Sequence, residues 1–193
     1  MPKCLAIIPA RAGSKRLPGK NMVNLGCKPL VAWTMEAAKK SGVFSRIVVS
    51  TDSDAIAGLA VKNQLELSVR PERWAKGEPW MLALWIRHLL TKAEWHGAVM
   101  FLQPTSPFRE AWHVRSAWAA YLTAKSDSLV SVDPWDKVNG AIYIFDSARD
   151  LRRRGLYDHG SRRFEMNARA SIDIDTPEDL EKADRAAREW EYL

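Results

Sequence analysis

Residues 5–21, Leu5-Ala6-Ile7-Ile8-Pro9-Ala10-Arg11-Ala12-Gly13-Ser14-Lys15-Arg16-Leu17-Pro18-Gly19-Lys20-Asn21, decide the fold of this chain. They join an apolar run of strand length to a loop that contains two glycines and four cations. Small residues let backbone N–H groups approach an anion closely, and Arg and Lys side chains supply neutralising charge. A loop at the carboxyl end of a first strand also lies where open α/β sheets bind ligands. The stretch therefore predicts a triphosphate-binding loop.

Two common phosphate-binding patterns do not describe this loop. The Walker type needs four residues between its glycines, followed by Lys-Ser or Lys-Thr. Here five residues separate Gly13 from Gly19, and Asn21 follows Lys20. The dinucleotide fingerprint with three spaced glycines is absent as well. The loop therefore binds phosphates in a different geometry, or it is a solvated turn without a ligand.

The composition is that of an ordinary soluble globular protein. The 193 residues are 47% hydrophobic and 27% charged, which predicts one domain with a sizeable core. A net charge of +6 and a pI of about 9.4 favour anionic partners: nucleotides, acidic sugars or nucleic acid. Because no nucleic-acid-binding module and no basic-aromatic stripe is recognised, we expect no nucleic-acid partner.

The cysteines and the apolar runs indicate the compartment. Cys4 and Cys27 have no metal-ligand spacing, which fits a reducing environment. A strand begins within four residues of the N-terminus, which leaves no room for a signal peptide. No apolar run approaches the length that crosses a bilayer. We therefore expect a cytoplasmic protein without a membrane partner.

Strand and helix patterns alternate along most of the chain. After the first strand, the expected strands are 46–50, 65–69, 98–102, 128–132, 141–145 and 171–175, and the expected helices are 28–40, 55–63, 80–94, 111–124, 146–154 and 176–190. Residues 156–168 have the composition of a loop. The alternation predicts a three-layer αβα architecture with a mostly parallel, Rossmann-like sheet.

Polar residues follow several of these strands. Residues 51–54, Thr-Asp-Ser-Asp, have the chemistry of a helix N-cap, and capping alone accounts for them. Arg70 directly follows strand 65–69. Two prolines stiffen the loop 103–109, which suits holding side chains still for a ligand.

Asp173 and Asp175 form the candidate metal site. Because they are two residues apart in an expected strand, their carboxylates lie on one face. Paired carboxylates plus substrate phosphates suit Mg²⁺, which keeps several waters and takes few protein ligands. In the alternative, Asp175 only caps the helix that begins at Thr176. The combination of the pair with a phosphate-binding loop favours the metal.

Six blocks of the chain resemble, in order, the acylneuraminate cytidylyltransferases, which make CMP-activated sialic acid and its bacterial nonulosonic acid relatives. The blocks are residues 5–21, Val-Ser-Thr-Asp-Ser-Asp (49–54), Arg-Pro-Glu (70–72), Leu-Gln-Pro-Thr-Ser-Pro-Phe-Arg (102–109), Asn-Gly-Ala-Ile-Tyr-Ile (139–144) and Ser-Ile-Asp-Ile-Asp-Thr-Pro-Glu-Asp (171–179). The resemblance implies a nucleotidyltransferase fold of the GT-A-like type. It also implies a Mg²⁺-dependent reaction of CTP with an acidic sugar that releases pyrophosphate.

The resemblance further implies roles for individual residues. Catalytic roles would belong to Arg11, Lys20, Asp173 and Asp175, of which the two aspartates would hold the metal. The nucleotide would contact Ala10, Arg11, Gly13, Ser14, Lys15, Asn21, Arg70 and Gln103, and the acceptor would contact Gln103, Thr105, Ser106, Arg109 and Asn139. In such a reaction, charge neutralisation and alignment supply most of the rate.

Two segments depart from the family pattern. Residues 76–81 are bulkier and less polar than the nucleotide-pocket residues of the family, so a base other than cytosine stays open. Only residues 133–138 connect strand 128–132 to Asn139, where the family inserts a long segment that covers the sugar and builds the dimer interface. A smaller anion such as a phosphonate then becomes an alternative acceptor, with the arginines between 149 and 169 as its dock. A homodimer would have to form without the usual segment.

Two other functions fit parts of the pattern. Residues 173–175 superficially resemble the metal motif of glycosyltransferases that use nucleotide sugars, but that motif normally ends an earlier strand. The second alternative is a non-catalytic nucleotide-binding homologue, because the altered pocket and the missing insertion fit a loss of turnover. Release of pyrophosphate would separate the transferase from both.

Overall fold

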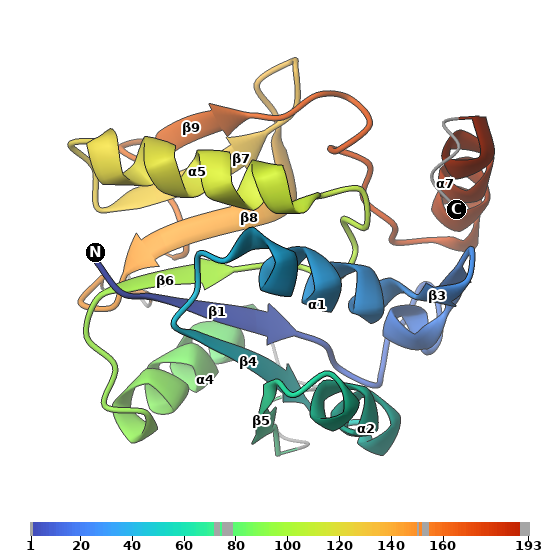
Figure 1. The fold of residues 1–193 in the computed structure, drawn as a ribbon, viewed down its shortest axis with the longest axis horizontal. Helices are drawn as coiled ribbons and strands as arrows, with labels where there is room; N and C mark the ends of the chain where they lie inside the picture. The colour runs from blue at the N-terminus through green and yellow to red at the C-terminus, as the bar shows by residue number, and fades with distance from the viewer. Residues whose placement is uncertain (1, 72–73, 75–78, 150, 152–154, 190–193) are drawn as a thin grey trace.

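A seven-stranded sheet forms the centre of the computed structural model, which describes residues 2–71, 74, 79–149, 151 and 155–189 (Figure 1). The strand order is β5-β4-β1-β6-β8-β7-β9. Neighbours are parallel except at β8, which runs antiparallel to both β6 and β7. This confirms the predicted mostly parallel sheet. The strands are β1 (Cys4–Pro9), β4 (Arg46–Thr51), β5 (Glu66–Val69), β6 (Ala98–Phe101), β7 (Ser128–Val132), β8 (Val138–Asp146) and β9 (Arg162–Glu165).

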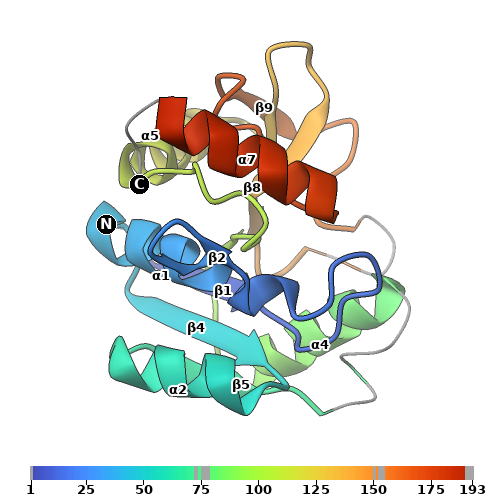
Figure 2. The same cartoon turned by 90° about the vertical axis from the view of Figure 1, so that its right-hand side faces the viewer.

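Helices cover both faces of the sheet, as expected for three αβα layers. One face is packed by α1, α2 and α5, and the opposite face by α4 (Figures 1 and 2). In the described part of the chain, every helix is too short or too polar to span a bilayer. The helices are α1 (Leu30–Ser41), α2 (Asp54–Lys62), α4 (Pro79–Lys92), α5 (Ala111–Thr123) and α7 (Pro177–Glu189).

Strand β1 explains why an unbroken apolar run opens the chain. Ala6 and Ile8 belong to the core on the α1 side, whereas Leu5 and Ile7 belong to the core on the α4 side. A central parallel strand is buried on both faces, so every position must be apolar. Each fully buried Leu or Ile contributes roughly 1.5–3 kcal/mol.

The C-terminal helix packs over the end of the sheet where β1, β4 and β6 finish (Figure 2). Ala183 and Ala187 of α7 join Leu17 and Leu25 in a third apolar cluster. Between these two leucines lie the 3₁₀ helix η1 (Lys20–Met22) and the strand β2 (Asn24–Leu25), which pairs with β3 (Lys28–Pro29). The last helix of the chain therefore braces the loop that follows the first strand.

The predicted strand over 171–175 is wrong. Ser171 lies in a turn and 172–175 have no regular structure, although Ile174 N donates to Thr105 O at 2.9 Å. The alternation that predicted a strand has another cause: Ile172 and Ile174 pack into the apolar cluster under α7. Within the described part of the chain, 172–175 belong to neither sheet.

Two further expectations need correction. Residues 156–168, expected to be a loop, contain β9, which pairs in parallel with β7. The sequence Arg-Arg-Phe-Glu hid it because edge strands carry charges, and only Phe164 packs against the core. Of the expected helix 146–154, Asp146 ends β8, 147–149 form a turn and a bend, and Leu151 is helical, while 150 and 152–154 lie outside the described residues.

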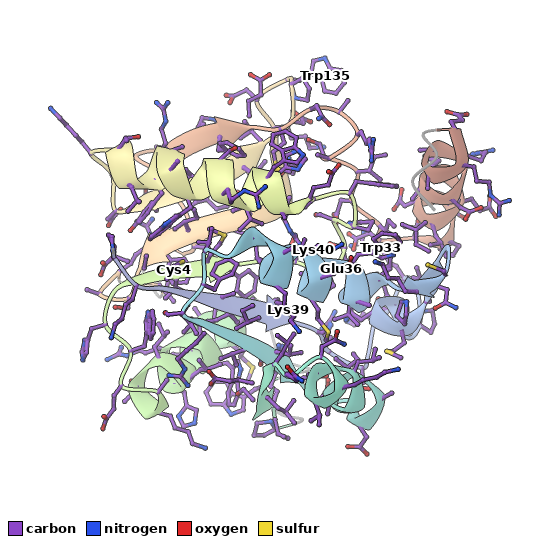
Figure 3. The ribbon with its side chains drawn as sticks, in the orientation of Figure 1. Cys4, Trp33, Glu36, Lys39, Lys40 and Trp135 are labelled. Carbon is purple, nitrogen blue, oxygen red and sulfur yellow. The ribbon has the colours of Figure 1, made fainter. Side chains whose placement is uncertain are left out.

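A tight hairpin over residues 133–137 joins β7 to β8. Asp133 N donates to Lys137 O at 2.8 Å, and Asp136 adopts a left-handed φ of 64°. Trp135 stands at the hairpin tip with 78% of its surface exposed (Figure 3). The connection is a minimal turn, so it cannot itself cover a ligand.

Candidate active site

The loop after β1 is fastened at both of its ends. Ala12 N donates to Asp52 Oδ1 at 2.7 Å, and Asn21 Nδ2 donates to Arg11 O at 2.9 Å. Ala10, at the start of the loop, is fully buried, and Asn21 is 7% exposed. Two side chains thus fix the main chain of the loop, which leaves its remaining groups to face outward.

The polar residues of segment 51–54 have two roles: one caps helix α2, and another holds the loop after β1. Ser53 is the N-cap of α2, since its Oγ accepts from Ile56 N at 3.4 Å. Asp52 does not cap the helix; its carboxylate holds Ala12 instead. Capping alone therefore does not account for this segment, and Asp52 is a residue of the site that the sequence interpretation missed.

Arg70 is a buried positive charge beneath the loop. It is 5% exposed and donates to Ser50 Oγ at 3.3 Å and Ser50 O at 3.0 Å. Trp85 Nε1 donates to the same Ser50 Oγ at 2.7 Å. Burial lowers the pKa of Arg70 to about 10, while Asp52 raises it and Arg11 lowers it. At neutral pH the guanidinium is still charged.

The outer part of the loop presents cations to solvent. Arg11, Lys15 and Arg16 are exposed, and Ser14 is half-buried beside Gly13. A Cβ on Gly13 would meet nothing within 4 Å, so this glycine leaves the surface of the loop open. The loop therefore has the open, basic surface that a triphosphate requires.

Asp175 connects the two halves of the candidate site. Its carboxylate accepts from Lys20 Nζ at 2.5 Å and also contacts Arg16. It does not cap α7, because Asp179 Oδ2 accepts from Thr176 N at 3.0 Å and Thr176 Oγ1 accepts from Asp179 N at 3.2 Å. This reciprocal capping leaves Asp175 available to the phosphate-binding loop.

Asp173 offers the second carboxylate. The residue is exposed, yet the surrounding protein removes enough water from its carboxyl to raise its pKa. A hydrogen bond from Thr105 opposes this shift, and the charge of Asp175 adds to it. Loss of water and, to a lesser degree, a neighbouring carboxylate thus raise the pKa of Asp173, and added positive charge would favour its ionised form.

These two carboxylates fit a hard divalent cation. The described residues contain no group of three or more His, Cys, Asp or Glu side chains that could hold a metal. Asp173 and Asp175 would therefore supply only part of the ligand set. Mg²⁺ commonly takes one or two carboxylates and completes its octahedron with substrate phosphates and water.

Gln103 lies across the start of β8. Its Oε1 is 2.6 Å from the position that a Cβ on Gly140 would occupy. Gly140 has a φ of +78°, a conformation that favours glycine, and any Cβ at this position would clash with Gln103 Oε1. Both constraints favour glycine over any other residue at position 140. Tyr143, whose hydroxyl is near the same point, has its pKa raised to about 12 by burial and then by Tyr157 and Asp173. The sequence interpretation did not assign Tyr143 to the site.

Three residues expected near the acceptor point into the protein. Ser106 and Arg109 are each 1% exposed, and Asn139 is 8% exposed. Asn139 joins three segments, because its Oδ1 accepts from Ser131 Oγ at 2.6 Å and its Nδ2 donates to Ser171 Oγ at 2.9 Å. All three side chains are therefore buried, and of the expected acceptor set only Gln103 and Thr105 are partly accessible.

The arginines between 149 and 169 do not form a common anion dock among the described residues. Arg149 has a fully buried side chain that pairs with Asp127 at 2.7 Å and Asp158 at 2.9 Å. Arg163 pairs with Asp136. Arg152, Arg153 and Arg154, like residues 76–78 of the altered nucleotide segment, lie outside the described residues.

Comparisons with known proteins agree with this geometry. The Cytidylyltransferase family profile matches residues 5–164. The N-acylneuraminate cytidylyltransferase of Escherichia coli O18:K1:H7 is 32% identical over 94% of this chain, which spans only 51% of that protein. The CMP-N,N'-diacetyllegionaminic acid synthase of Legionella pneumophila is 36% identical, with 92% of this chain and 93% of that protein covered. This chain thus spans about half the length of one relative and nearly all of the other.

Solved structures show the same fold. A CMP:2-keto-3-deoxy-manno-octonic acid synthetase in complex with CTP superposes with a TM-score of 0.76 at 17% identity, covering 97% of this chain and 99% of that one. A cytidylyltransferase from Leptospira borgpetersenii gives 0.72 at 19% identity, covering 98% and 88%. The alignment with the E. coli protein extends over 215 positions, more than the 193 residues here, so the alignment includes positions that have no counterpart in this chain. The profile match and the identity over most of the chain show that this protein belongs to the cytidylyltransferase family.

Proposed function

We propose that this protein transfers the cytidylyl group of CTP to a hydroxyl of an acidic sugar or a related small anion and releases pyrophosphate. The observation that carries this proposal is the contact of Lys20 with Asp175, which brings the basic loop and the carboxylate pair together at the carboxyl end of β1. Family membership supports cytosine as the base, and the names of both relatives support a nonulosonic acid as acceptor.

The chemistry divides among three groups of residues. The acceptor oxygen attacks the α-phosphorus in line, a new P–O bond forms, the bond to the bridging oxygen breaks, and the hydroxyl proton passes to solvent. Arg11, Lys15 and Lys20 neutralise the charge that develops on pyrophosphate. Buried Arg70, which lies close enough to Arg11 for their charges to interact, adds a fixed positive charge.

Asp173 and Asp175 would hold a divalent cation, with Mg²⁺ as the ion we expect. When bound, such an ion supplies Lewis-acid polarisation of the phosphates and favours ionisation of the acceptor hydroxyl. Asp175 also pairs with Lys20 and Arg16, and these pairs link the carboxylate to the basic loop.

The acceptor side is open at the β7–β8 hairpin. The minimal turn at 133–137 supports a member of the family that binds its acceptor without the covering segment. A smaller anion than a nonulosonic acid stays an alternative acceptor for that reason. Cys27 is exposed and Cys4 is buried and unpaired, which supports a reducing, cytoplasmic location.

Binding of the four ribonucleoside triphosphates with Mg²⁺ tests the proposal. The wild type is compared with the double variant Asp173→Ala, Asp175→Ala and with a matched control, Glu181→Ala, Glu189→Ala, which removes two exposed carboxylates of α7. We expect CTP-selective binding that is lost in the first variant and kept in the control. Pyrophosphate release is then measured with nonulosonic acids, 3-deoxy-octulosonic acid and small phosphonates. CTP binding without release on any of them would support the non-catalytic alternative.

A further inference from the structure

Arg109 joins three elements through one buried guanidinium. Its Nη1 donates to Gln103 O at 3.0 Å and to Ala141 O at 2.8 Å, and its Nη2 donates to Thr34 Oγ1 at 2.6 Å. These acceptors belong to the loop after β6, to β8 and to α1. All three acceptors are neutral oxygens. The three hydrogen bonds therefore fix the relative positions of these elements and do not neutralise the charge of Arg109.

The two carbonyl groups that share Nη1 flank the contact between Gln103 and Gly140. Gln103 Oε1 occupies the space directly over Gly140, where no Cβ could fit. This arrangement holds only while the backbone at Gln103 and the backbone at Ala141 keep a fixed separation. Arg109 Nη1 bridges those backbones and thus sets that separation.

We propose that Arg109 is a positioning residue that fixes Gln103 against β8 and so places the Gln103 amide in the active site. The inference rests on the proposed function and on the contacts of Gln103 with nucleotide and acceptor that the family resemblance implies. Arg109 itself is 1% exposed, and its guanidinium donates to oxygens of the protein. A lysine cannot replace it, because a single ammonium cannot reproduce the planar fork that meets Gln103, Ala141 and Thr34 together.

Two variants separate this role from general stabilisation. Arg109→Lys removes the fork, whereas Thr34→Val removes the partner of Nη2 and the 3.4 Å bond from Thr34 Oγ1 to Gln103 O, and leaves both carbonyl contacts of Nη1. We expect Arg109→Lys to lower kcat/KM for the acceptor about tenfold, as for loss of one or two buried hydrogen bonds. Thr34→Val is expected to lower the melting temperature but to leave kcat/KM within about twofold. Gly140→Ala displaces Gln103 from the opposite side and is expected to reproduce the kinetic defect of Arg109→Lys.

A double-mutant cycle gives the decisive kinetic result. In a Gln103→Ala background, Arg109→Lys is expected to cause no further loss of kcat/KM, because the residue through which Arg109 acts is gone. Equal losses in the Gln103 and Gln103→Ala backgrounds would overturn the proposal and leave Arg109 a general structural residue.

A spectroscopic readout keeps this inference separate from the proposed function. The side-chain amide resonance of Gln103 is identified by its disappearance in Gln103→Ala. We expect it to shift in Arg109→Lys and Gly140→Ala and to stay in place in Thr34→Val. This outcome supports the positioning role even if no acceptor gives pyrophosphate, which would contradict only the proposed function. An unchanged resonance in folded Arg109→Lys would contradict the positioning role.

Discussion

The Nζ atom of Lys20 lies 2.5 Å from Oδ1 of Asp175, although 155 positions separate the two residues in the chain. Lys20 ends the basic loop after the first strand, and Asp175 precedes the last helix. A cation proposed to bind phosphate and a candidate metal ligand thus neutralise each other. Substrate and metal can replace both partners together without leaving an unpaired charge.

Lys20→Ala is expected to lower kcat by roughly 10²–10³-fold, as for removal of one preorganised group that stabilises transition-state charge. Pyrophosphate release measures the effect. Lys62→Ala, which removes an exposed cation from the end of α2, is the matched control and should have no effect. A kcat within about threefold of the wild type in Lys20→Ala would rule out a catalytic role for this lysine.

Asp173→Asn is expected to abolish metal-dependent CTP binding and to stabilise the folded protein slightly. The folded-state pKa of Asp173 is raised, so the carboxylate disfavours folding at a pH above that pKa, and the penalty disappears as the pH falls. Because the residue is exposed, solvent screening should keep the gain within about 1 kcal/mol. Urea unfolding at neutral pH measures it, and a loss of stability would contradict the raised pKa.

His113→Gln is expected to make the protein more resistant to acid. Burial, together with the charges of Arg109 and Arg169, lowers the pKa of His113 from 6.5 to about 4. Since the unfolded chain binds this proton more readily, stability is lost as the pH falls from 6.5 toward 4. The loss between pH 7 and pH 5 is about 2 kcal/mol.

Glutamine is a suitable replacement because His113 Nδ1 accepts from Glu110 N at 3.1 Å, and a Gln at this third helical position can accept the same bond. Urea midpoints at pH 7 and pH 5 are compared for the two proteins. Equal decreases in both would show that His113 does not control the acid sensitivity.

Arg149→Met is expected to cost about 3 kcal/mol of stability, because it leaves Asp127 and Asp158 without the buried cation that they share. Arg163→Met is the matched control. Its pair with Asp136 is exposed, so the expected cost is below about 1 kcal/mol. Chemical denaturation measures both, and similar losses in the two variants would show that burial of Arg149 does not matter.

Much of the candidate site follows from the sequence. The apolar run of β1 predicts a central parallel strand, and the basic glycine loop after it predicts anion binding at the carboxyl edge of the sheet. The Asp173 and Asp175 pair predicts a divalent cation. These features depend on short-range order and on residue chemistry, which a linear pattern records directly.

Only the tertiary structure decided which polar side chains reach the site. Asp52 holds the loop rather than a helix, whereas Arg109 and Asn139 turn inward to tie strands together. The sequence predicts a loop over 156–168 and a strand over 171–175. The structure instead has β9 within the first range and no regular structure over 172–175. One physical reason explains these differences. A charged or alternating pattern shows which kinds of contact a residue can make, but its actual partner depends on which distant parts of the chain fold next to it.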